Sequence, residues 1–86
     1  MDFKGLYFWS VKQFKLNAMK KYYVNKKAQS NGDHEVHQED CIYLPSTENR
    51  KYLGQFSSCK DAVEEAKKDY SKSNGCKTCS KECHTS

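Results

Sequence analysis

Residues 75–84 read GCKTCSKECH, a cysteine-rich ending whose partners lie far upstream, at His37 and Cys41. Cys76 and Cys79 form a Cys-x2-Cys pair, whose two intervening residues turn the chain tightly enough for both thiolates to reach one zinc ion, about 2.3 Å from each sulfur. His37 and Cys41, spaced as His-x3-Cys, offer one imidazole and a third thiolate. The pattern predicts one zinc site with ligands His37, Cys41, Cys76 and Cys79.

Two residues near the C-terminus compete with His37 for the fourth position. Cys83 lies one helical turn beyond Cys79, so both could face the same ion if this segment is helical. His84 follows directly. If Cys83 is not a ligand, we expect it to be a free thiol near the ion.

The length and composition predict a small domain that needs help to fold. The chain has 86 residues, only 36% of them apolar, and a mean hydropathy of −1.03. An apolar core of this size leaves stability marginal, and a metal or a disulfide is often recruited. Met19 opens the sequence MKKYYV, which reads like a natural protein start. We therefore expect a zinc-binding domain at residues 19–86, preceded at 1–18 by an extension that is either loose or an amphipathic helix.

The lack of a signal-peptide pattern predicts a cytoplasmic protein. The five cysteines are an odd number, and the first residues lack the apolar core of a signal peptide, so metal binding is favoured over disulfides. No run is long and apolar enough to span a membrane. The net charge of +4 comes almost entirely from lysines spread along the chain, which is more typical of a solubility feature than of a nucleic-acid patch.

The first half of the domain predicts a β-hairpin. Residues 20–29 are rich in tyrosine and valine and run into Asn31-Gly32, a pair that suits a two-residue type I′ turn. The return strand is then residues 34–38, which puts His37 opposite Lys26. His34 is expected beside the turn, at the surface.

The second half predicts a third strand and one helix. Residues 52–56 (YLGQF) suit a short strand, in which Gly54 indicates a bulge or a close backbone approach. A helix over residues 59–70 follows, begun by a capping box of Ser58 and Asp61. Its apolar stripe holds Cys59, which we expect to pack in the core. The fold class is therefore α+β: a small zinc-stabilised domain with an N-terminal β-hairpin and a short third strand packed on one α-helix, ending in a Cys-x2-Cys knuckle.

These motifs carry two family resemblances. From Met19 onwards, the chain resembles a group of small uncharacterised bacterial proteins with His-x3-Cys, Leu-Pro, Leu-Gly-x-Phe, a helix, Gly-Cys-x2-Cys and a terminal Cys-His. More distantly, residues 36–80 are similar to the zinc domain of Ada-type DNA methyl-phosphotriester repair proteins. Those proteins carry Cys-x3-Cys, a strand, a Glu-Ala helix and Pro-Cys-Lys-Arg-Cys.

The Ada-type resemblance implies a zinc domain, but the chain departs from the family at the reactive position. In that family the first cysteine of Cys-x3-Cys takes a methyl group from a DNA phosphate, and here this position is His37. A zinc-bound imidazole has no free lone pair with which to attack a methyl carbon. The Pro and Arg of the family motif are Gly75 and Thr78, so its grip on DNA phosphate is not implied either.

The function predicted from the sequence is a non-enzymatic zinc-binding module with a structural metal that serves as an interaction domain for nucleic acid or protein. One alternative is zinc-thiolate or dithiol chemistry, with Cys83 accepting an alkyl group or an oxidising equivalent. Another is a metal-handling protein with extra ligands at His34, Cys59, Cys83 and His84. The chain has no Ser-His-Asp order, paired-carboxylate signature or Gly-rich phosphate loop.

Overall fold

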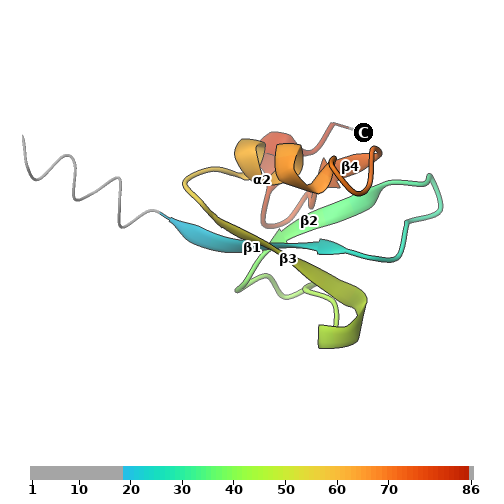
Figure 1. The fold of residues 1–86 in the computed structure, drawn as a ribbon, viewed down its shortest axis with the longest axis horizontal. Helices are drawn as coiled ribbons and strands as arrows, with labels where there is room; N and C mark the ends of the chain where they lie inside the picture. Colours follow the sequence, from blue (N-terminus) through green and yellow to red (C-terminus); the bar gives the residue numbers. More distant parts are fainter. Residues whose placement is uncertain (1–18, 86) are drawn as a thin grey trace, which may run out of the picture.

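Among the residues that the structure describes, a four-stranded sheet carries an α-helix on one face (Figure 1). The computed structural model describes residues 19–85, so the expected extension at residues 1–18 lies outside the described part. The strands have the order β3-β1-β2-β4. The elements are β1 (Lys20–Asn25), β2 (His34–Gln38), the 3₁₀ turn η1 (Thr47–Asn49), β3 (Arg50–Phe56), α2 (Cys59–Ala66), β4 (Ser73–Gly75) and the 3₁₀ turn η2 (Lys81–Cys83).

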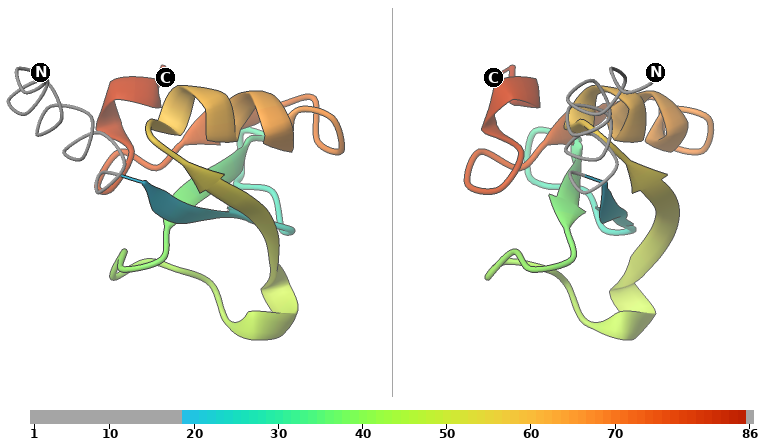
Figure 2. Two further views of the ribbon diagram at one scale, coloured as in Figure 1. Left: turned by 60° about the vertical axis from the view of Figure 1, so that its left-hand side comes forward. Right: turned by 90° about the vertical axis from the view of Figure 1, so that its left-hand side faces the viewer.

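The core lies between α2 and the sheet, which confirms the predicted α+β class. Both short C-terminal pieces, α2 and η2, lie on one side of the sheet, and the loop that contains η1 lies beyond the other side (Figure 2). Small residues on the inner side of α2 let the helix approach the strands closely. The buried cluster consists of Tyr22, Val24, Val36, Leu53, Cys59, Ala62, Val63 and Ala66.

The predicted hairpin forms, but its register and turn differ from the expectation. His37 pairs with Tyr23 and not with Lys26, because the connection between β1 and β2 is a longer loop. Within it, Gly32 has a positive φ of 93° while Asn31 does not, which excludes a type I′ turn. The Asn31 side chain instead accepts a hydrogen bond from the backbone N–H of Asp33. This local bond stabilises a wider turn and moves His37 along the sheet.

The predicted third strand is present as β3 and contains the irregularity that Gly54 indicated. Opposite β1, Tyr22 pairs with Gly54 and Tyr23 pairs with Tyr52, so Leu53 is an extra residue in the ladder. Gly54 has a φ of 125°, a conformation that other residues rarely adopt. The resulting bulge lets Leu53 turn into the core beneath α2.

The helix ends earlier than predicted, and the residues beyond it form an unpredicted strand. Helix α2 stops at Ala66, and residues 73–75, for which the sequence indicated no strand, form β4. Strand β4 runs parallel to β2, with Val36 paired to Gly75. Ser58 is the N-cap of α2, but its side chain makes no capping hydrogen bond, so the predicted capping box is wrong. The pairing of β4 with β2 positions the knuckle.

Candidate metal centre

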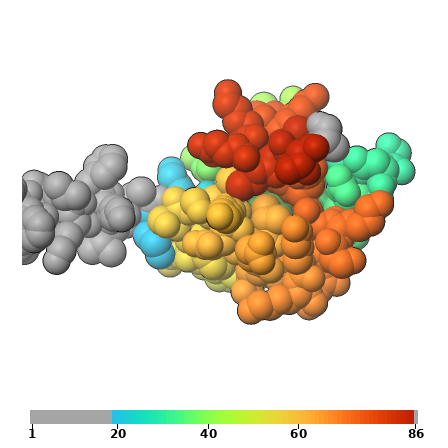
Figure 3. All heavy atoms as spheres, turned by 90° about the horizontal axis from the view of Figure 1, so that it is seen from above, coloured from blue at the N-terminus to red at the C-terminus, as the bar shows by residue number. Residues whose placement is uncertain are grey.

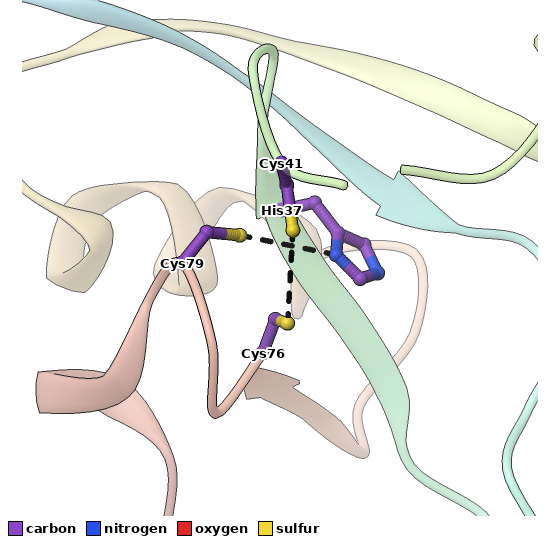
Figure 4. A group of neighbouring side chains, drawn as sticks. All are labelled: His37, Cys41, Cys76 and Cys79. Carbon is purple, nitrogen blue, oxygen red and sulfur yellow. Dashed lines mark hydrogen bonds between the residues drawn. The ribbon is translucent and has the colours of Figure 1, made fainter. Parts of the chain in front are cut away.

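The four side chains predicted to bind zinc lie together in the structure. His37, Cys41, Cys76 and Cys79 each offer one ligand atom, and these atoms all lie within 4.8 Å of one another. The four side chains point toward a common centre from two separate parts of the chain (Figure 4). Within residues 19–85, no other group of cysteine, histidine and acidic side chains has an arrangement that could hold a metal ion.

The parallel pairing of β2 with β4 brings the two halves of the cluster together. Val36 pairs with Gly75, and the N–H of Cys76 donates a 2.9 Å hydrogen bond to the carbonyl of Val36. Cys76 therefore leaves β4 directly beside His37. Because successive residues of a strand point to opposite faces, Val36 enters the core while His37 points away from it, toward the cluster.

A turn after β2 and a hydrogen-bonded side chain place the remaining two thiols. The N–H of Cys41 donates to the carbonyl of Gln38, which turns the chain back and keeps Cys41 close to His37. The side-chain amide of Gln38 donates a 2.8 Å hydrogen bond to the carbonyl of Cys79. Gln38 thus holds the knuckle against the end of β2.

The spacing of the four ligand atoms suits a tetrahedral ion. Two sulfurs that are each about 2.3 Å from a tetrahedral zinc lie about 3.8 Å apart. The Cys41 and Cys76 sulfurs are 3.9 Å apart, and the Cys79 sulfur lies 3.9 Å from Nδ1 of His37. His37 would therefore bind through Nδ1.

Backbone N–H groups point at two of the sulfurs. The N–H of Thr78 lies 3.4 Å from the sulfur of Cys76, and the N–H of Gln38 lies 3.3 Å from that of Cys79. Such donors stabilise the thiolate form that binds a metal. The backbone around the cluster therefore both positions the sulfurs and stabilises negative charge on them.

A carboxylate faces the outer nitrogen of His37. The imidazole is 1% exposed, and its Nε2 atom has no hydrogen-bond partner. The carboxylate of Glu35 lies 3.6 Å from that nitrogen. A carboxylate facing the outer nitrogen of a metal-ligating histidine holds the ring in place and favours the tautomer whose inner nitrogen is free to bind. Burial also lowers the pKa of His37, with Glu35 opposing this shift, so the imidazole stays neutral at pH 7.

The Cys79 thiol keeps its proton when no ion is present. Burial, assisted by the neighbouring Cys41, raises the pKa of Cys79 to about 12, and the backbone N–H of Gln38 only partly opposes this. A metal ion must therefore displace this proton at any pH in the neutral range. Metal binding and proton release are linked at this residue.

We expect metal affinity to fall as the pH falls. Because the Cys79 thiol is protonated in the metal-free protein and ionised when bound, it alone should raise the dissociation constant about tenfold for each pH unit between pH 8 and pH 6. Protonation of His37 adds to this loss only below its ordinary pKa of 6.5, because that pKa is lowered in the fold. Competition titrations against a chromophoric chelator at pH 8, 7 and 6 would measure the slope. An affinity independent of pH would contradict thiolate binding by Cys79.

The competing ligands lie elsewhere, and one expectation is wrong. Cys83 is joined to Cys59 in a disulfide, so it is not the free thiol expected near the ion. Cys59 is in the core as predicted, but as half of this bond. Nδ1 of His84 is 3.0 Å from the carbonyl of Gly75. His34 is half-buried, with its ring stacked 4.2 Å from that of Tyr70.

Sequence reasoning missed the residues that support the cluster. Gln38 and Glu35 sit in the same strand as His37, at positions where a polar residue is ordinary. Their roles follow from β2 lying beside the knuckle, which no local pattern indicates. Ser80, directly after Cys79, is 1% exposed and donates its N–H to the carbonyl of Cys76, closing the knuckle turn. Its position immediately beyond the Cys-x2-Cys pair is the one signal that could have indicated this.

Comparisons with protein-family models, curated proteins and solved structures find no match. The two family resemblances described from the sequence therefore stay predictions. Among residues 19–85, no helix has the length and apolar character needed to cross a lipid bilayer.

Proposed function

We propose that this protein is a non-enzymatic zinc-binding module in which the ion is structural. The observation that carries this proposal is the convergence of His37, Cys41, Cys76 and Cys79 at the junction of β2 and the knuckle. Four protein ligands fill a tetrahedral shell, which is typical of structural zinc sites, whereas catalytic sites leave one position for water. The ion would join two segments that are otherwise linked through short strands and the hydrogen bonds of Gln38 to Cys79.

The donor set favours zinc over other divalent metals. Three thiolates and one imidazole are soft or borderline donors, which suit zinc, while magnesium and calcium require oxygen ligands. Cys41 and Cys76 are 9% and 3% exposed, so both sulfurs are largely shielded from solvent. Such shielding is also typical of a structural ion rather than of an exchangeable one.

Metal content and the spectrum of a cobalt-substituted sample test this function. We expect one zinc per chain by elemental analysis, and cobalt(II) in its place should give the intense visible bands of a tetrahedral thiolate site. The Cys59→Ser/Cys83→Ser double variant is the matched control, because it removes two cysteines outside the cluster and should still bind one ion. Protein that binds no metal, or an octahedral cobalt spectrum, would overturn the proposal.

The interaction surface we propose lies next to the cluster. Ile42 and Tyr43 follow Cys41 directly and are 81% and 61% exposed, so an ion held by Cys41 would also hold this apolar pair in place. Exposed apolar side chains on a rigid turn favour a protein partner. A nucleic-acid partner would instead bind through lysines and would weaken steeply as salt rises, which a salt series distinguishes.

A further inference from the structure

The disulfide between Cys59 and Cys83 lies beside the proposed metal centre but outside it. It joins the first residue of α2 to the last residue of η2, which are 24 positions apart in the sequence. Seen from above, the C-terminal segment lies directly against α2 (Figure 3). The bond thus attaches the chain just after the knuckle to the main helix.

One cysteine of this disulfide is more exposed than the other. Cys59 is 4% exposed and belongs to the core, while Cys83 is half-buried. Both line an open hollow of about 500 Å³ between α2 and η2. Its lining also includes Lys60, Lys67, Glu64 and Glu82. Because Cys83 is the more exposed of the two residues, we expect a small thiol that enters this hollow to react there.

Attack on Cys83 makes Cys59 the leaving group. When a thiolate attacks Cys83, the electron pair of the disulfide stays on Cys59, the first residue of α2. The backbone N–H groups of the first helical turn favour negative charge there, while the burial of Cys59 and the acidic Asp61 in the same turn oppose it. The Ser58 side chain makes no capping hydrogen bond to them, so they are not already occupied by that residue.

Cys83 is packed against the residue that precedes a cluster cysteine. A Cβ atom built on Gly75 would lie 2.7 Å from Cβ of Cys83 and 2.6 Å from the carbonyl oxygen of Ser80, so only glycine fits beneath η2. Gly75 is followed directly by Cys76, and the N–H of Cys83 donates to the carbonyl of Ser80. Cys83 therefore contacts the residues at both ends of the knuckle, Gly75 before Cys76 and Ser80 after Cys79.

From these contacts we propose that Cys59–Cys83 is a thiol–disulfide exchange site for low-molecular-weight thiols, and that its redox state sets the metal affinity of the neighbouring cluster. The coupling rests on the proposed zinc function. In the first step a thiolate forms a bond to the Cys83 sulfur, and the Cys59–Cys83 bond breaks to leave the Cys59 thiolate. A second thiolate then attacks the sulfur of the first thiol, which releases the Cys83 thiolate and forms a disulfide between the two small thiols. Two small thiols are thus oxidised while Cys59 and Cys83 are reduced.

The expected coupling is measured by zinc affinity in the two redox states. With the disulfide intact, η2 is attached to α2 and the knuckle is pre-organised, so zinc should bind about tenfold more tightly than in protein reduced with a phosphine. Linkage requires the reverse effect, in which zinc makes the disulfide tenfold harder to reduce in a glutathione redox buffer, equivalent to about 30 mV. Equal zinc affinity in both states would overturn the coupling, and zinc binding in neither state would overturn the proposed function as well.

Single-cysteine variants test the direction of attack independently of zinc affinity. In Cys59→Ser the half-buried Cys83 remains, and in Cys83→Ser the buried Cys59 remains. With oxidised glutathione we expect the first variant to form a mixed disulfide at least about tenfold faster, as followed by mass spectrometry. Equal rates for the two variants would overturn the proposed site. A mixed disulfide of the wild-type protein with glutathione that forms mainly at Cys59 would overturn it as well. Should a variant not fold, trapping the mixed disulfide of the wild-type protein and locating it by peptide mapping gives the same answer.

Discussion

Removal of the metal with a strong chelator is expected to abolish the cooperative unfolding transition of this domain. A structural zinc contributes on the order of 10 kcal/mol to the folding of small domains, while the whole stability of a globular domain is about 5–15 kcal/mol. The Cys59–Cys83 disulfide closes a loop of 24 residues, which contributes only about 3 kcal/mol. The disulfide alone therefore cannot replace the ion.

Circular dichroism with a thermal ramp, after elemental analysis has shown the metal to be gone, measures this effect. Adding zinc back should restore the transition, which distinguishes loss of the ion from damage by the chelator. The experiment is best made with the disulfide intact, so that only one cross-link is removed. A metal-free protein that still unfolds cooperatively at the same temperature would show that the ion is not structural.

Replacing His37 with alanine should lower zinc affinity by at least about 100-fold, whereas replacing His34 should leave it unchanged. Loss of one of four protein ligands opens the coordination shell to water and leaves a gap where the 1% exposed imidazole lay. His34 belongs to the same strand, β2, but its ring stacks on Tyr70 and takes no part in the cluster. The two variants are thus matched in residue type and element.

Zinc competition titrations of both variants, with their thermal transitions measured in excess zinc, separate ligation from general stability. His34→Ala should lower the melting temperature somewhat through its lost contact with Tyr70 while it retains one zinc per chain. His37→Ala should lose both the bound zinc and the thermal transition. Equal zinc affinities for the two variants would exclude His37 as a ligand and would leave Cys41, Cys76 and Cys79 with another fourth partner.

The spacing within each half of the cluster made its four members predictable. Cys-x2-Cys and His-x3-Cys are local patterns whose geometry depends on a few residues of backbone, so they can be recognised without knowing the fold. The choice of His37 over Cys83 or His84 as the fourth ligand was harder to predict. It depends on Cys83 being joined to Cys59, and cysteine connectivity cannot be deduced from sequence because distant residues meet only in the folded chain.

The sequence by itself determined an α+β domain with a hairpin, a third strand and a helix whose small apolar residues face the sheet, because periodicity and glycine positions act over short distances. Only the tertiary structure decided that Ser73–Gly75 is a strand beside β2, since serine, asparagine and glycine have little preference for strands and the pairing is imposed by the partner. That parallel contact puts Cys76 next to His37 and Cys83 above Gly75. The two halves of the candidate metal centre, and the disulfide beside it, therefore exist as neighbours because of long-range pairing that no local segment encodes.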